Sequence, residues 1–128
     1  MGLFDFLTSS SQESKTSDIW ETISDPSQLE PIIEASKDQP QLIYKHSHRC
    51  SVCFVSKGNL ESAADNILES ADMHFVNVVN SRQASDHIAS ELGVRHESPQ
   101  VILLDNGEVI WHASHGGIKG EAVLDKLT

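Results

Sequence analysis

The sequence predicts an α/β domain with a four-stranded mixed sheet and helices on both faces. Short aliphatic segments alternate with longer amphipathic ones, which is typical of strands joined by crossover helices. The last two aliphatic segments flank an Asn-Gly pair at residues 106–107, which favours a tight hairpin. The chain has 128 residues, which is room for one domain and a short tail.

The first 17 residues are predicted to lie outside this domain. Residues 1–7 read Met-Gly-Leu-Phe-Asp-Phe-Leu, an apolar turn that lacks the basic start and long apolar core of a secretion signal. Residues 8–17 are polar and rich in Ser, which predicts a flexible linker. The domain itself is expected to span residues 18–128.

The domain is predicted to begin with a helix and a strand. Ser27 and Glu30 have the spacing of a capping box, which predicts a helix that begins after Ser27 and ends at residues 38–40, Asp-Gln-Pro. Residues 41–45, Gln-Leu-Ile-Tyr-Lys, are aliphatic and aromatic and predict the first strand. Trp20 and residues near it are expected to contact the core.

A longer helix, a strand and a further helix are predicted next. Apolar residues recur at helical spacing over residues 51–70, with Gly58 as the expected kink. The expected inner face of this helix contains Val52, Val55, Leu60, Ala63, Ala64, Ile67 and Leu68. Residues 73–80 predict the second strand, and residues 81–92 predict a helix that Gly93 ends.

The chain ends in a predicted hairpin and helix. Residues 101–104 and 109–113 form the two strands, and Gly116 and Gly117 open a last helix over residues 118–127. The order is α-β-α-β-α-β-β-α. Crossover helices imply that the first two strands are parallel, and the hairpin adds an antiparallel pair.

Composition excludes several classes of function. Nine Lys and Arg against 19 Asp and Glu give a net charge of −10, so nucleic acid is not an expected partner. No apolar run approaches the roughly 20 residues of a spanning helix, so no integral membrane association is expected. Two cysteines cannot form a disulfide scaffold. The expectation is a cytoplasmic domain with one cysteine pair.

Cys50 and Cys53 directly follow a predicted strand and open a predicted helix. A sulfur in this place lies near the free N–H groups of the first helical turn, which favour the thiolate and lower the pKa. A positive charge on His46, His48 or Arg49, just upstream, would act in the same direction. Cys53 lies one turn further on, in reach of a mixed disulfide formed at Cys50. The pattern predicts thiol–disulfide exchange.

Three alternatives stay open for this pair. The cysteines are structural, or Cys53 is a bystander to chemistry at Cys50, or the pair binds metal together with His46 and His48. These four side chains are suitable ligands for Zn²⁺ or copper. Structural zinc sites usually draw ligands from two separated segments, and the sequence has no second cysteine pair. We therefore expect no metal.

Ser98-Pro99 precedes the third predicted strand. Proline is excluded from the interior of a central strand, so it belongs at the start. In the thioredoxin architecture a cis proline occupies this place and faces the redox cysteine, and the residue before it offers its backbone to an extended substrate. We therefore expect a thioredoxin-like fold in which Ser98 has this role and the bond to Pro99 is cis.

Three blocks of sequence carry a family resemblance. They are residues 44–52, Tyr-Lys-His-Ser-His-Arg-Cys-Ser-Val, residues 81–85, Ser-Arg-Gln-Ala-Ser, and residues 94–101, Val-Arg-His-Glu-Ser-Pro-Gln-Val, the last followed by Trp-His-Ala-Ser-His at residues 111–115. Together they resemble the monothiol-type bacilliredoxins, thioredoxin-like proteins of the bacillithiol system. The resemblance extends from about Trp20 to the C-terminus.

The resemblance implies a reaction at Cys50. Its thiolate attacks the mixed disulfide between bacillithiol, the thiol co-substrate, and an oxidised client protein, so that bacillithiol moves to Cys50. A second bacillithiol or a disulfide reductase then releases it. Family members typically have Ser where this chain has Cys53, so a two-cysteine mechanism, or a general dithiol reductase, is an alternative.

Side chains near the cysteines are candidates for binding the substrate or the thiol. These candidates are His46, Ser47, His48, Arg49, Ser98 and Pro99. By the resemblance, Arg49 is expected to hold a carboxylate of bacillithiol. His96, Glu97 and Gln100 flank the expected cis proline, Pro99, and are candidates for lining the substrate site. Two other classes of function remain as alternatives: a metal-binding module, and a non-catalytic adaptor that docks through residues 1–7.

Overall fold

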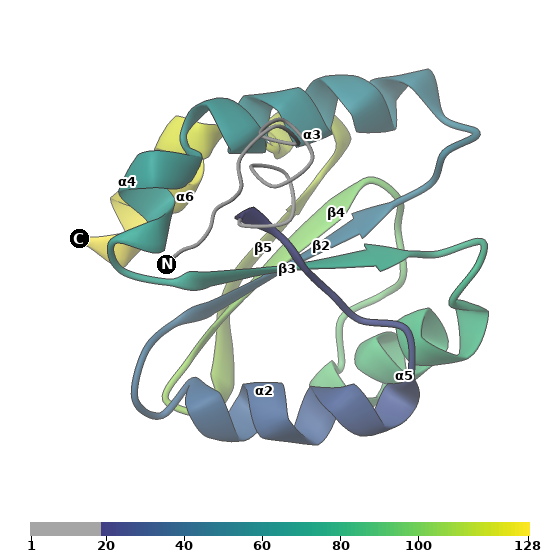
Figure 1. Ribbon diagram of the computed structural model, residues 1–128, viewed down its shortest axis with the longest axis horizontal. Helices are drawn as coiled ribbons and strands as arrows, with labels where there is room; N and C mark the ends of the chain where they lie inside the picture. Colours follow the sequence, from purple (N-terminus) through teal and green to yellow (C-terminus); the bar gives the residue numbers. More distant parts are fainter. Residues whose placement is uncertain (1–18) are drawn as a thin grey trace, which may run out of the picture.

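The computed structural model describes residues 19–128, which form a five-stranded mixed sheet between two layers of helices (Figure 1). The strands are β1 (Glu21–Thr22), β2 (Gln41–His46), β3 (Asp72–Asn77), β4 (Gln100–Asp105) and β5 (Glu108–Ser114). The helices are η1 (Pro26–Gln28), α2 (Leu29–Ala35), α3 (Ser51–Ser62), α4 (Ala64–Leu68), α5 (Arg82–Leu92), η2 (His115–Gly117) and α6 (Gly120–Leu127). The predicted N-terminal turn and linker, residues 1–17, lie outside the described residues.

The strand order is β1-β3-β2-β4-β5. β2 lies parallel to β3 and antiparallel to β4, and β4 and β5 form the hairpin, so these predicted pairings are confirmed. Asn106 and Gly107 have φ of 55° and 82°, as the predicted tight turn requires. Gly93 ends α5 with φ of 67°, also as expected.

The prediction of four strands is wrong by one. β1 has only two residues, and it pairs parallel with β3 at the edge of the sheet. A two-residue strand is too short to show alternating hydrophobicity, so the sequence gives no sign of it. The neighbouring side chains of Trp20 and Ile23 are buried, as predicted.

Each face of the sheet packs against its own helices (Figure 1). Successive residues of a strand point to opposite faces, which separates the core into two clusters. Leu42 and Tyr44 of β2 pack with Leu60 and Ile67 below α3, α4 and α6. Ile43 belongs to the cluster under α2 and α5. The predicted coverage of both faces is confirmed.

The first helical segment begins two residues earlier than predicted. Asp25, not Ser27, caps η1: its carboxylate accepts a hydrogen bond from the backbone N–H of Ser27 at 2.8 Å. The Gln28 side chain closes the capping box by accepting from the backbone N–H of Asp25 at 2.9 Å. Pro26 fits the first helical position, where a backbone N–H has no helical partner.

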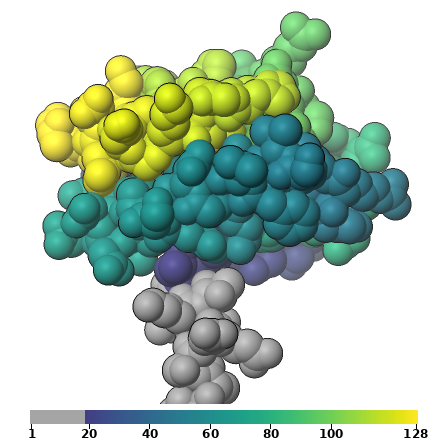
Figure 2. All heavy atoms as spheres, turned by 90° about the horizontal axis from the view of Figure 1, so that it is seen from above, coloured from purple at the N-terminus to yellow at the C-terminus, as the bar shows by residue number. Residues whose placement is uncertain are grey.

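The predicted helix over residues 51–70 is interrupted at Ala63, not at Gly58. A Cβ atom on Gly120, the first residue of α6, would collide with Ala63 Cβ, so α6 approaches the chain closely at this break. Figure 2 shows α6 lying alongside α3 and α4. The last helix also begins later than predicted, because Gly116 and Gly117 form the 3-10 turn η2.

Within the described part of the chain, no helix has both the length and the apolar character needed to cross a bilayer.

Candidate functional site

Cys50 lies where the chain leaves β2 and enters α3, as the sequence predicts. It is the N-cap residue of α3, and its Sγ accepts a hydrogen bond from the backbone N–H of Cys53 at 3.3 Å. Both cysteines are free thiols; Cys50 is partly exposed and Cys53 is fully buried. The two sulfurs therefore occupy different environments one helical turn apart.

These environments separate the acidities of the two thiols. Hydrogen bonds from the thiol and the backbone N–H of Cys53 lower the pKa of Cys50. Burial raises the pKa of Cys53, and its hydrogen bond with Cys50 acts in the same direction. Cys50 is thus the thiol that ionises first, and it is also the one that solvent reaches.

Two segments enclose the Cys53 sulfur. Cys53 Sγ accepts a hydrogen bond from the backbone N–H of Ser47 at 3.5 Å and lies 3.6 Å from Ser98 Oγ. The Ser98–Pro99 peptide bond is cis, as predicted. Pro99 is buried, and its carbonyl accepts a hydrogen bond from the backbone N–H of His115 at 3.1 Å. The structure thus brings the predicted Ser47 and Ser98 together beside Cys53.

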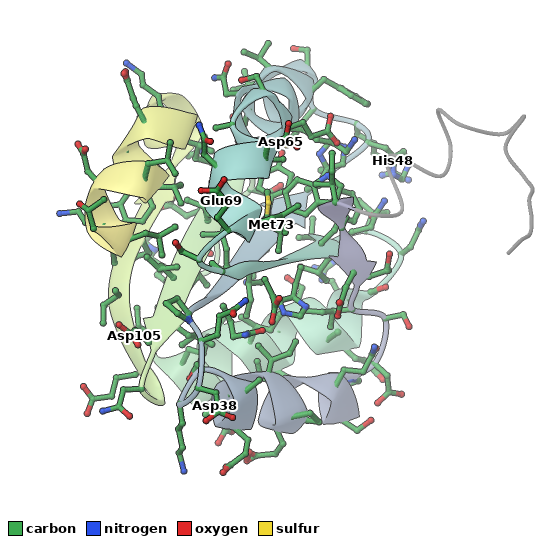
Figure 3. All side chains as sticks on the ribbon, turned by 60° about the vertical axis from the view of Figure 1, so that its left-hand side comes forward. Asp38, His48, Asp65, Glu69, Met73 and Asp105 are labelled. Atoms are coloured by element: carbon green, nitrogen blue, oxygen red, sulfur yellow. The ribbon has the colours of Figure 1, made fainter. Side chains whose placement is uncertain are left out.

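Of the predicted basic side chains, one is buried and two are exposed. His46 is buried beneath the loop and has a lowered pKa, chiefly because of burial, so it does not carry the positive charge considered for it. His48 is exposed at the surface, with Nδ1 3.3 Å from Asn77 Nδ2 (Figure 3). Arg49 is exposed beside Cys50, and its backbone N–H donates to Ser47 Oγ at 3.2 Å.

Tyr44 is a buried polar residue that was predicted to lie in the first strand but was not predicted as a site residue. Its hydroxyl donates to the Cys53 carbonyl at 2.7 Å and lies 3.1 Å from His46 Nδ1. A carbonyl only accepts, so the Tyr44 hydrogen goes to Cys53 and the His46 Nδ1–H donates to Tyr44. Tyr44 therefore ties the first turn of α3 to β2. Tyr44 is the chain's single tyrosine, and its place in a buried strand was the available signal.

Apolar side chains are exposed on the outer surface of α3 shortly after Cys50. Val52, Phe54 and Val55 are 48%, 55% and 64% exposed. The prediction that Val52 and Val55 face inward is wrong, because Cys53 and the residues that follow it at helical spacing take the inner face. The ring of Phe54 also packs edge-on against His46, with centroids 5.0 Å apart.

The predicted histidine and cysteine ligands do not assemble into a metal site. Among residues 19–128, no three or more His, Cys, Asp or Glu side chains are grouped so that they could hold a metal ion. His46 is held by Tyr44, and His48 lies beside Asn77.

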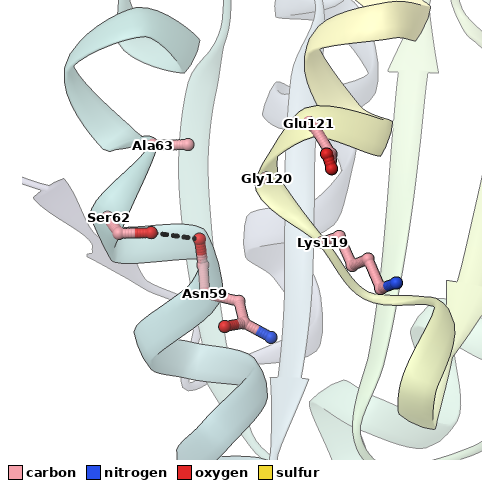
Figure 4. A pocket seen from close by; sticks show the side chains of 6 residues that line it. All are labelled: Asn59, Ser62, Ala63, Lys119, Gly120 and Glu121. Atoms are coloured by element: carbon pink, nitrogen blue, oxygen red, sulfur yellow. Dashed lines mark hydrogen bonds between the residues drawn. The ribbon is translucent and has the colours of Figure 1, made fainter.

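One hollow on the described surface lies away from the cysteines. It has a volume of 330 Å³ and lies between the α3–α4 break and the start of α6 (Figure 4). Its lining residues are Asn59, Ser62, Ala63, Lys119, Gly120 and Glu121. The Cys50 thiol, in contrast, lies at the surface and is partly exposed.

Comparison with known proteins agrees with this geometry. A family model described as "Monothiol bacilliredoxin BrxC" matches residues 21–123. A solved structure of a proposed oxidoreductase with a thioredoxin fold is 27% identical, with a TM-score of 0.76 over 85% of this chain and 94% of that chain.

Two thioredoxins are also similar in structure. Mitochondrial thioredoxin 3 of Saccharomyces cerevisiae is 18% identical, with a TM-score of 0.67 over 89% of this chain and 96% of its own. Thioredoxin of Malassezia sympodialis is 20% identical, with a TM-score of 0.65 over 85% of this chain and 87% of its own. The predicted thioredoxin-like fold is confirmed.

Proposed function

The chain belongs to the monothiol bacilliredoxin family and is a thiol–disulfide oxidoreductase, and from this premise we propose that it removes bacillithiol from mixed disulfides on oxidised client proteins. The observation that carries the proposal is Cys50, a partly exposed thiol of lowered pKa at the start of α3. Such a thiol supplies the thiolate that disulfide exchange requires.

The first step transfers bacillithiol from the client to Cys50. The Cys50 thiolate attacks the bacillithiol sulfur, a new sulfur–sulfur bond forms, and the bond between client and bacillithiol breaks. The client sulfur leaves with the electron pair and takes up a proton, so the client is reduced and Cys50 is oxidised. A second bacillithiol thiolate then attacks the adduct, which releases bacillithiol disulfide and restores Cys50.

A second candidate is a dithiol reaction, which the position of Cys53 favours. In it, the Cys53 thiolate attacks Cys50 Sγ and releases bacillithiol or the sulfur of a client disulfide. The Cys50–Cys53 disulfide that remains requires two electrons from a disulfide reductase. Hydrogen bonds from the Ser47 N–H and the Ser98 hydroxyl would stabilise the Cys53 thiolate during this attack.

Substrate binding is proposed for the residues that border Cys50. The exposed guanidinium of Arg49 and the exposed imidazole of His48 are available to a carboxylate of bacillithiol. Ser47, Ser98 and Pro99 border the cysteines, and the backbone of Ser98 would bind an extended client segment. His46 is buried, so we propose that it acts through Tyr44 rather than on the substrate.

The reaction needs reduced thiols around the protein. Bacillithiol serves as co-substrate, oxidised proteins as clients and a disulfide reductase as a further partner, and no metal takes part. Free cysteines persist in reducing compartments, so we place the activity in the cytoplasm.

Intact-mass spectrometry tests the proposal directly. The reduced protein is exposed briefly to bacillithiol disulfide without reductant. A stable adduct on Cys50 is expected for the one-cysteine route, whereas loss of two protons without an adduct would establish the dithiol route. Absence of any reaction would contradict both candidates.

A second assay follows removal of bacillithiol from a client. The substrate is a single-cysteine protein that has been modified with bacillithiol disulfide. Cys50→Ser is expected to abolish the removal, and Cys53→Ser is the matched control that retains the attacking thiol. Unchanged removal by Cys50→Ser would refute the assignment of Cys50.

A further inference from the structure

Lys45 is a fully buried lysine in the strand that leads to the cysteines. It belongs to β2, and its side chain is directed toward α5, on the face of the sheet opposite Tyr44. Lys45 Nζ lies 3.1 Å from the Ser85 carbonyl of α5. In residues 19–128, no carboxylate forms an ion pair with it. Burial of an amine is costly, and burial lowers the pKa of Lys45 to about 8.

The second partner of Lys45 is His96, in the loop between α5 and β4. Lys45 Nζ lies 3.1 Å from His96 Nδ1. An ammonium group only donates, so Nδ1 accepts and His96 is a neutral imidazole with its hydrogen on Nε2. Ser85 Oγ also lies 3.4 Å from His96 Nδ1. Buried Lys45 of β2 and Ser85 of α5 therefore meet exposed His96 of the loop at the edge of the core.

Several charges act on this contact. Burial and the Lys45 charge lower the pKa of His96, and Arg82 of α5 adds to this effect. Asp86 of α5 and Glu97 of the loop oppose it. Protonation of His96 would direct its Nδ1–H at the ammonium group, so the contact requires neutral His96.

The loop that contains His96 also carries Ser98, two residues further on. Ser98 Oγ lies 3.6 Å from Cys53 Sγ. On the other side of the loop, the Pro99 carbonyl accepts from the backbone N–H of His115. The Lys45 contact thus holds the loop from the α5 side, and His115 holds it from the β5 side.

We propose that Lys45 is a positioning residue: its hydrogen bond to His96 holds the loop so that Ser98 faces the Cys53 sulfur. This inference rests on the proposed redox role of the cysteine pair. Loss of the contact releases Ser98 from Cys53, and the Cys53 thiolate loses a hydrogen-bond donor. The exchange step that involves Cys53 then becomes slower.

Lys45→Met separates this role from simple filling of space. Methionine keeps the unbranched stem and removes the cost of burying the charge, but it leaves the His96 and Ser85 acceptors without this donor. If Lys45 only fills space, the thiol chemistry of Cys53 should stay unchanged in this variant. If Lys45 positions the loop, the Cys53 thiol should be altered, whatever the change in stability.

The test uses the full chain and two titrations. Heteronuclear NMR of the imidazole nitrogens reports the tautomer and the pKa of His96. Ultraviolet absorbance of the thiolate, in a Cys50→Ser background, reports the pKa of Cys53. We expect Lys45→Met to raise the pKa of His96 and the pKa of Cys53, and to disturb the Nε2–H tautomer of His96. With Cys50 present, we expect the thiol–disulfide exchange step that involves Cys53 to become about two- to tenfold slower, which is the effect of losing one hydrogen bond.

His96 is exposed, so changing its side chain leaves the packing of the core in place. His96→Asn keeps an acceptor for Lys45 and is expected to retain most of the rate, whereas His96→Leu removes the acceptor and is expected to match Lys45→Met. The proposal would be overturned if His96→Asn and His96→Leu had equal rates of the exchange step that involves Cys53. An unchanged pKa of Cys53 in Lys45→Met would also overturn it. Both titrations work without bacillithiol, so a failed bacillithiol reaction would refute the proposed function and leave this inference intact.

Discussion

The Tyr44 hydroxyl provides a sharp test of how β2 holds the start of α3. Tyr44→Phe removes one buried oxygen and keeps the ring, whose centroid lies 5.6 Å from that of Trp20 and 6.0 Å from that of Phe75. Apolar packing is therefore preserved. The change removes the hydrogen bond to the Cys53 carbonyl and the one from His46.

The expected cost follows from these two bonds. Each intramolecular hydrogen bond contributes about 0.5–1.5 kcal/mol, so the free energy of unfolding should fall by about 1–3 kcal/mol. For a domain of this size the melting temperature should fall by about 4 °C per kcal/mol. His46→Phe removes only one of the two bonds and should cost less than Tyr44→Phe.

Urea unfolding, followed by the fluorescence of buried Trp20 and partly buried Trp111, measures this difference. The midpoint should fall and the slope should stay constant, because the surface exposed on unfolding is unchanged. The double variant Tyr44→Phe/His46→Phe should cost less than the sum of the single variants, because they share a bond. A loss below about 0.5 kcal/mol for Tyr44→Phe would refute the role of the hydroxyl.

Three further predictions concern other parts of the domain. Cys53→Ala removes the thiol that donates to Cys50 and should raise the pKa of Cys50 in a thiolate absorbance titration; no change would contradict the hydrogen bond. Gly120→Ala should destabilise the domain by about 1–3 kcal/mol in urea unfolding, because the new methyl group collides with Ala63 Cβ, and Ala63→Gly should restore part of the loss. His74 has a pKa lowered by burial, so its stabilising effect is present above about pH 6.5 and is lost as the pH falls through its folded-state value. His74→Gln should therefore flatten the decline in stability at acidic pH, and an unchanged pH profile would count against it.

Local sequence patterns were sufficient for much of the fold. Asn106 and Gly107 adopt the positive φ values that their turn requires, and Gly93 ends α5 in the same way. The place of Cys50 between a strand and a helix could also be predicted, because aliphatic runs and helical spacing are local signals.

Other features depend on contacts between distant segments. β1 exists because β3 offers it an edge, and the break at Ala63 occurs where Gly120 packs closely. Val52 and Val55 have the spacing of an inner face, yet Cys53 takes that face because its thiol lies between Ser47 and Ser98. The spacing of apolar residues within one helix does not show which side chains of other segments will contact it.

Local backbone preferences were enough to predict the α/β class, the position of the cysteines at a helix start and the proline before β4. The burial of Cys53, the hydrogen bond from Tyr44 to its carbonyl and the contact of Lys45 with His96 became known from the folded chain. Burial and hydrogen-bond partners depend on surfaces that meet only after the chain has folded, so local patterns do not contain them.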